Sequence, residues 1–227
     1  MDYTDEMMNE TQMDAAAKAK QRKRAAALRL APLSSGMMLL FWMMIPGFIS
    51  GFLTSELCME ALPRIYYIVG EFLGYACSLV MCFVMFRLTC LDNRYTVSGA
   101  LYLIAVVLTF VTNLWCGDYS NVPPGATLLL ALALCLECVA GVIEYTAHAD
   151  LLDYFDVNFA AKWRRLRIIE ATAYVVTGVG MIGLIMVESI ALFVIGVLGN
   201  IALVVAGFMR YVYLYQTGTT LQAYQGK

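Results

Sequence analysis

The fourth apolar stretch of the chain carries three ionisable residues and a glycine on one helical face. Glu137, Gly141, Glu144 and His148 are spaced four, three and four residues apart, and His148 is the only histidine of the sequence. Residues at these spacings lie on the same side of an α-helix. A carboxylate that is buried without a cationic partner takes up a proton or binds a cation, which is the chemistry of a proton- or cation-coupled transporter.

Two more acids and one amide stand in other apolar runs. Glu71 lies in the second run, Glu170 near the start of the fifth, and Asn200 in the sixth. With Arg210 assigned to the cytoplasmic end of the sixth run, we expect no Lys or Arg inside any run, and therefore no ion-pair partner for Glu137. We predict Glu137 as the central proton or cation site, with the other ionisable groups as steps toward either surface. In the alternative interpretation, a protonated Glu137 only fixes helix packing through a hydrogen bond to a neighbour such as Asn200 or Thr177.

Cysteines suggest a competing redox chemistry. Cys135 and Cys138 form a C-x-x-C within the fourth apolar run, and Cys58 and Cys116 fall in two predicted external loops, where they could form a disulfide. A membrane thiol oxidoreductase would use such pairs. However, Cys135 lies about 14 Å below the start of its helix, too deep for easy exchange with the loops. Buried cysteine is also a common small apolar residue.

A metal site and familiar enzyme chemistry are not indicated. His148, Asp150 and Asp153 follow each other near one end of the fourth run, but one histidine with two flexible acids is a pattern of low specificity. The sequence contains no phosphate-binding loop, no H-E-x-x-H and no G-x-S-x-G. We therefore predict no metal and no cofactor, and a non-enzymatic function is favoured.

Composition places these residues in a membrane. Hydrophobic residues make up 61% of the 227 and charged residues 14%, whereas soluble domains have roughly 45–50% and 25%. A helix needs roughly 20 apolar residues to cross a bilayer. The sequence therefore predicts an all-α, polytopic bundle of six transmembrane helices, at about residues 36–55, 65–86, 96–115, 126–146, 168–187 and 189–213.

The last two predicted spans form one nearly continuous apolar stretch. As a single helix, residues 168–213 would be roughly 69 Å long, more than twice the thickness of the bilayer core. We therefore predict a tight hairpin at Glu188 between them.

Basic residues predict the orientation. With a cytoplasmic N-terminus, only Arg64 of the fifteen Lys and Arg lies outside, as expected from the positive-inside rule. We predict a plasma-membrane protein with both termini in the cytoplasm. Its parts are a basic helical segment at 1–34, the six-span domain at 35–215 and a short tail at 216–227.

Two cytoplasmic segments are candidates for contacts. The first is the Ala- and Lys-rich part of 1–34, which favours a helix from about Met13 that stops at Pro32 and lies against anionic lipids. The second is 149–167, which we predict as an interfacial amphipathic helix. Its apolar residues recur at three- and four-residue steps: Leu151, Leu152, Phe155, Phe159 and Trp163.

Glycines at four-residue spacing predict close helix contacts. Gly47 and Gly51 lie in the first span, and Gly70 and Gly74 lie in the second. Such small residues let helices approach closely within lipid. Their partners are helices of the same chain, of another copy, or of a different membrane protein.

Together these patterns favour a small integral membrane transporter or a membrane-embedded transport subunit that uses intramembrane carboxylates. The first alternative is a non-catalytic assembly or regulatory subunit that binds a partner through its cytoplasmic helices. The second is the thiol oxidoreductase. No nucleic-acid partner is expected.

Overall fold

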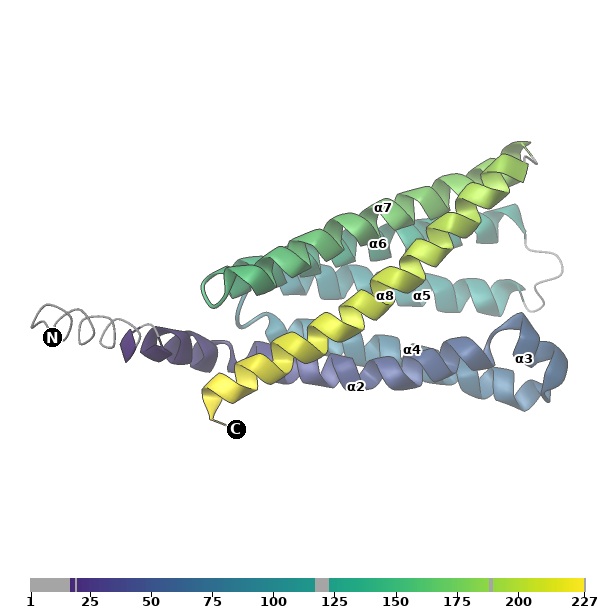
Figure 1. Ribbon diagram of the computed structural model, residues 1–227. Helices are drawn as coiled ribbons and strands as arrows, with labels where there is room; N and C mark the ends of the chain where they lie inside the picture. Colours follow the sequence, from purple (N-terminus) through teal and green to yellow (C-terminus); the bar gives the residue numbers. More distant parts are fainter. Residues whose placement is uncertain (1–16, 19, 117–122, 188–189, 227) are drawn as a thin grey trace, which may run out of the picture.

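The computed structural model describes residues 17–18, 20–116, 123–187 and 190–226, and these residues are helical apart from their connections (Figure 1). A helical segment at 20–29 precedes the first labelled helix. The helices are α2 (Ala31–Leu53), α3 (Glu56–Ala61), α4 (Arg64–Leu88), α5 (Arg94–Cys116), α6 (Pro124–Asp153), α7 (Val157–Val187) and α8 (Ile190–Gln225). The predicted all-α class is confirmed.

The six long helices form a closed ring. Each of α2, α4, α5, α6, α7 and α8 packs against the next, and α8 packs back against α2. Figure 1 shows why the ring closes: α8 runs obliquely across the bundle, from the far end of α7 to the beginning of α2. This tilt carries the middle of α8 across one face of the bundle.

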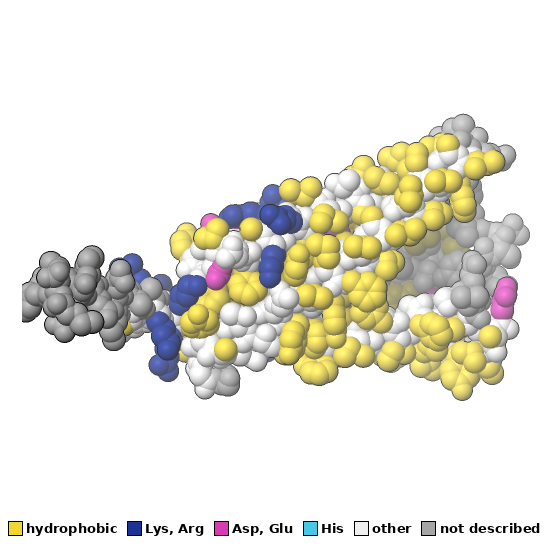
Figure 2. Space-filling view, viewed as in Figure 1, with side chains coloured by type: hydrophobic (Ala, Val, Ile, Leu, Met, Phe, Trp, Pro, Cys, Tyr) yellow, Lys and Arg dark blue, Asp and Glu magenta, His cyan; other side chains and the backbone are white. Residues whose placement is uncertain are grey.

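Among the described residues, five helices are long and apolar enough to cross a membrane, as expected for an integral membrane protein. They are α2, α4, α5, α6 from Gly125, and α8. Large apolar side chains are exposed along them, and they cover much of the face seen in Figure 2. A surface of this kind needs lipid or another apolar cover. The remaining long helix, α7, carries four basic residues and Glu170 in its first half.

The predicted interfacial helix at 149–167 is wrong. Instead, α6 continues to Asp153 and α7 begins at Val157, so that a three-residue connection joins two long helices. The apolar residues of this segment face the chain's own interior, and Leu152, Phe155 and Trp163 are buried. The same periodicity suits a lipid surface or a neighbouring helix. Here the neighbour is the C-terminal part of α8, to which Trp163 donates a hydrogen bond at Thr217 (3.3 Å).

Small residues set two close helix contacts, although not all of those predicted. Ser50 donates a hydrogen bond to the backbone oxygen of Gly70 at 2.7 Å and joins α2 to α4. Gly47 and Gly51 face open space instead. The second contact is the crossing of α7 and α8, where the backbones at Gly180 and Gly196 meet. The predicted hairpin at Glu188 falls on residues 188–189, which lie outside the described residues.

One end of the bundle holds most of the basic surface. The segment at 20–29 and the end of α8 lie toward the same end in Figure 1, and Lys and Arg gather there in Figure 2. The segment at 20–29 ends just before α2, whose first turn contains Pro32. Lys23 of that segment pairs with Asp156 at 3.2 Å, and Gln225 donates to the backbone oxygen of Ala27 at 2.8 Å. The first contact holds this segment to the connection between α6 and α7, and the second holds it to the end of α8.

Candidate functional site

An ion pair crosses the interior of the bundle. Arg210 of α8 donates from Nη2 to both carboxylate oxygens of Glu144 on α6, at 2.8 and 2.9 Å. The Glu144 side chain is fully buried, and the Arg210 side chain is 15% exposed. The expectation that no cation lies within a span is therefore wrong. Because α8 is tilted and 36 residues long, Arg210 meets Glu144 inside the bundle rather than in water.

Two side chains complete the surroundings of Glu144. Tyr102 of α5 donates its hydroxyl to Glu144 Oε2 at 2.9 Å. His148, one turn along α6, places Nε2 3.5 Å from Glu144 Oε1. The other ring nitrogen, Nδ1, lies 2.5 Å from the hydroxyl oxygen of Tyr95. The carboxylate oxygens of Glu144 are thus contacted by side chains of α5, of α8 and of its own helix, α6.

Aromatic rings enclose the ion pair. The Arg210 guanidinium lies 5.4 Å from the centre of the Tyr145 ring, a distance at which a cation and an aromatic face attract each other. Tyr145 in turn donates to Glu170 of α7 at 2.6 Å. Trp163 meets the His148 ring edge-on, with centroids 4.7 Å apart. Four helices therefore contribute to one buried polar cluster, the inner cluster: Tyr95, Tyr102, Glu144, Tyr145, His148, Trp163, Glu170 and Arg210.

Glu137 lies two turns before Glu144 on α6. Its side chain is partly buried and makes no hydrogen bond or ion pair with any described residue. It interacts electrostatically with Glu170, whose like charge repels it, and with Tyr174. The predicted hydrogen bond between Glu137 and Asn200 is not formed, because the Asn200 side chain is exposed and donates to the backbone of its own helix.

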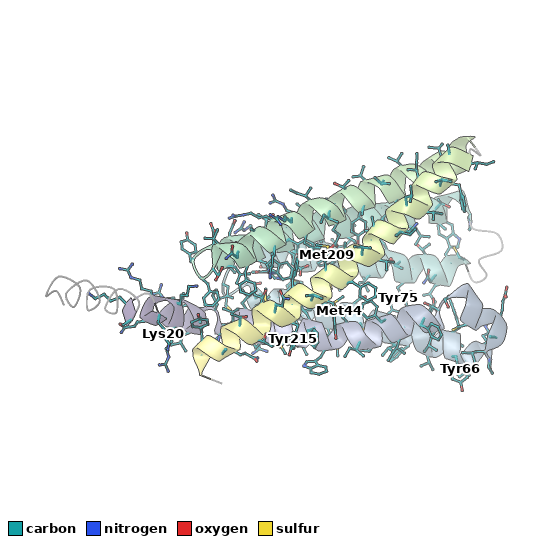
Figure 3. All side chains as sticks on the ribbon, in the orientation of Figure 1. Lys20, Met44, Tyr66, Tyr75, Met209 and Tyr215 are labelled. Carbon is teal, nitrogen blue, oxygen red and sulfur yellow. The ribbon has the colours of Figure 1, made fainter. Side chains whose placement is uncertain are left out.

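Glu71 belongs to a second polar group, the outer cluster, between α4 and α5. Its Oε1 accepts hydrogen bonds from Tyr67 at 3.0 Å and from Asn113 at 3.1 Å. Asn113 also donates to the hydroxyl of Tyr75 at 2.8 Å. Tyr75 lies between the ribbons of α8 and α2 in Figure 3, and Figure 2 shows the surface hollowed between α2 and the first half of α8.

The cysteines and the acids at the end of α6 lie apart from these clusters. Cys135 is exposed and Cys138 partly exposed, and Cys58 and Cys116 are both free thiols. Asp150 pairs with Arg94 at 2.7 Å, so it is part of an ion-pair network at the helix ends. Among the described residues no three His, Cys, Asp or Glu side chains are grouped as metal ligands.

Arg210 is the functional candidate that the sequence analysis missed. It is the single charged residue between Glu188 and Lys227, so a signal was present in the sequence. Counting charges by side had assigned it to the cytoplasmic end of the last span. The tyrosines of the inner cluster carry no such signal, because aromatic residues are common throughout the apolar runs.

Comparison with protein families, curated proteins and solved structures finds no match for this chain. What the clusters can do must therefore be argued from their charges and contacts.

Proposed function

We propose that this protein is a small membrane transporter, or the membrane-embedded subunit of one, that binds a proton or another cation inside its helix bundle. The observation that carries the proposal is the charge balance of the interior. Four glutamates stand within the long helices that the structure describes: Glu71, Glu137, Glu144 and Glu170. Among the described residues, Glu144 is the only one of them in an ion pair.

The cost of burying a charge explains why the excess of acids in the interior matters. A charged side chain at the centre of a membrane helix costs about 2.5–3.5 kcal/mol on insertion scales. An ion pair such as Glu144 with Arg210 offsets part of that cost. An acid without a pair avoids the cost by taking up a proton or by binding a cation from outside. The unpaired acids are therefore places where a positive charge is stabilised.

Glu137 and Glu170 are the central pair in this proposal. They repel each other, and neither has an ion-pair partner among the described side chains. One proton or one monovalent cation between them would remove the repulsion. Glu71 in the outer cluster and Glu144 in the inner cluster then stand as steps toward the two surfaces, and the hollow beside Tyr75 is the approach from outside.

The proposed topology has six crossings, with α7 as the sixth. This is supported by the length of α7 and by its packing along α6 and α8, both of which are apolar enough to span. The basic end would face the cytoplasm of a cell bounded by the plasma membrane. There the exposed Lys20, Arg22 and Arg24 would contact anionic lipids.

The two alternatives have less support. The apolar side chains of 149–167, which an assembly subunit would present to its partner, are largely occupied by contacts within the chain. The basic segment at 20–29 remains the surface on which that alternative depends. A thiol oxidoreductase would need Cys135 and Cys138 near another redox pair, and no such contact is seen among the described residues.

Ligand-dependent stability tests the proposal. We would measure the thermal midpoint of the purified protein with Li⁺, Na⁺, K⁺, Mg²⁺ and small organic ammonium ions, and across about pH 5 to 9. A ligand at 100 times its Kd adds about 2.7 kcal/mol to the stability of the folded state. We expect at least one cation, or the proton, to shift the midpoint of wild type and not of Glu137→Gln.

Glu60→Gln is the matched control, because it removes one negative charge at an exposed position of α3. It should respond as wild type does. The proposal is contradicted if the profiles of wild type and Glu137→Gln are parallel in every condition.

A further inference from the structure

His148 is buried with one nitrogen unsatisfied. Its side chain is fully enclosed, and Nε2 forms no hydrogen bond. That nitrogen lies 3.5 Å from Glu144 Oε1, the same oxygen that accepts from Arg210 at 2.8 Å. A buried polar atom without a partner costs free energy, so such an atom calls for an explanation. Here two groups that can carry positive charge face one carboxylate oxygen.

The protonation state of the ring decides what Nε2 can do. When the Tyr95 hydroxyl donates a hydrogen bond to Nδ1, the neutral imidazole carries its single proton on Nε2. A separation of 3.5 Å is too long for a good hydrogen bond to Glu144. An imidazolium has N–H groups on both nitrogens. It would donate from Nδ1 to the Tyr95 oxygen and from Nε2 to Glu144, with a charge that draws the carboxylate closer.

The charges around the His148 imidazole favour the uptake of one more proton. When Glu170 is ionised, Glu144 and Glu170 together carry one negative charge more than Arg210 balances. The titratable and charged groups around the His148 imidazole come from four helices and one connection. Those of the helices are Tyr95, Arg94 and Tyr102 of α5, Glu144 and Tyr145 of α6, Glu170 of α7 and Arg210 of α8. Asp92 lies in the connection before α5 and acts on Tyr95. With His148 protonated, the inner cluster becomes neutral. Imidazole is also the side chain that ordinarily changes charge near neutral pH.

We propose that His148 accepts a proton during the transport cycle, in addition to the site at Glu137 and Glu170, and that it then competes with Arg210 for Glu144. This inference rests on the proposed transport function and names its coupling ion as the proton. One proton from water is added to the imidazole, and no other bond is made or broken. Glu144 then shares its charge between His148 and Arg210.

The competition matters because Arg210 ties α8 to α6. These two helices share little other packing, whereas α8 packs extensively on α7 and α2. Weakening the bond from Arg210 to Glu144 therefore frees the part of α8 that carries Arg210. Protonation at His148 would change how tightly the ring of helices is held on the side of the hollow.

The single histidine makes a direct test practical. Protein labelled with ¹⁵N-histidine, purified through a tag that contains no histidine, gives imidazole signals from His148 alone. We expect the ring to change from neutral to charged as the pH is lowered from about 8 to 5. The change should occur at lower pH in Glu144→Gln, which removes the attracting charge. It should occur at higher pH in Arg210→Gln, which removes the competitor.

Controls and a second variant keep the outcome decisive. Glu71→Gln alters the outer cluster and should leave the change where it is in wild type. If Arg210→Gln does not fold, Glu144→Gln decides the matter, because it nearly preserves the shape of the side chain. A ring that stays neutral over the whole range overturns the proposal, and so does a change that Glu144→Gln leaves unmoved.

A flux measurement separates this inference from the transport function itself. In liposomes with an imposed pH gradient, His148→Gln should lose the pH dependence of wild-type flux. If flux is present and its pH dependence survives in His148→Gln, the role of His148 is wrong and the transport function stands. If wild type gives no flux and no cation shifts its thermal midpoint, the transport function is wrong, and the ¹⁵N signals still decide whether His148 and Arg210 compete for Glu144.

Discussion

The interior of this bundle depends on a few side chains whose charges cannot be separated without cost. Glu144 accepts from Arg210 and from Tyr102, and each comes from a different helix. Removing one partner of a buried pair leaves the other charge without compensation, which is worse than removing both. For the same reason, the loss of Arg210 should lower the free energy of unfolding, whatever its effect on transport.

Substituting Arg210 tests this reasoning. Arg210→Met should lower the free energy of unfolding by about 3–5 kcal/mol, because Glu144 remains buried without its pair. The double variant Arg210→Met with Glu144→Leu should recover part of the loss. Both can be measured by unfolding in mixed micelles. If the double variant is less stable than Arg210→Met alone, the ion pair is not what the two residues contribute.

At the scale of helices, close contacts between small residues decide where α7 and α8 cross. A Cβ atom added at Gly180 would overlap the backbone of Gly196, and one added at Gly199 would meet Thr177. Neither clash can be relieved by turning a flexible side chain, so the helices must move apart. The crossing thereby fixes the angle of α8, and that angle carries Arg210 to Glu144.

Adding a methyl group to α7 at one of two positions distinguishes the effect of the contact with α8 from the effect of helix propensity. Gly180→Ala should destabilise the fold by about 1–3 kcal/mol through overpacking. Gly178→Ala, two residues away, meets nothing within 4 Å and should be neutral or slightly stabilising, since alanine favours a helix. Thermal midpoints of the two proteins give the comparison. Equal midpoints would mean that the helices do not touch at Gly180.

The connection between α4 and α5 is held by an ion pair that depends on pH. A hydrogen bond from the Arg94 guanidinium, with help from its backbone N–H and its charge, lowers the pKa of the Asp92 carboxyl despite partial burial. A carboxyl whose pKa is lower when folded stabilises the fold above its unfolded pKa of about 4, and this stability is lost as the pH falls through the folded pKa.

Asp92→Asn should therefore be less stable than wild type at pH 7. Because the Arg94 side chain is 39% exposed, the difference should be at most about 1 kcal/mol. It should shrink as the pH falls below about 4. Chemical unfolding at a series of pH values measures it, with Glu60→Gln as the control for loss of one charge. A difference that grows in acid would contradict the assignment.

For the molecule as a whole, the sequence predicted the all-α class and a membrane location from composition and the lengths of the apolar runs. Five helices of sufficient length and apolarity agree with that prediction. The sequence could not predict the tilt of α8, because tilt follows from packing against neighbouring helices. For the same reason it missed the pairing of Arg210 with Glu144. It also assigned the stripe at 149–167 to lipid, since periodicity does not distinguish a lipid surface from a helix of the same chain.

The shape of the whole molecule matches the proposed direction of access. The end that holds the segment at 20–29 and the end of α8 is drawn together by Lys23 with Asp156 and by Gln225 with Ala27, whereas the face near Tyr75 is hollowed (Figures 2 and 3). A cation arriving from the hollow would meet the outer cluster first, then Glu137, and then the inner cluster. The acids along this route should therefore control how much positive charge crosses.

Charge movement through the reconstituted protein tests that claim most directly. Wild type, Glu137→Gln and Glu60→Gln would be incorporated into liposomes that carry an imposed pH gradient and cation gradient, and the decay of each gradient would be followed with fluorescent dyes. We predict that wild type and Glu60→Gln dissipate at least one gradient faster than empty liposomes and that Glu137→Gln does not. If Glu137→Gln moves charge as fast as wild type, or if wild type is no faster than empty liposomes, the account of the interior acids as a transport site is contradicted.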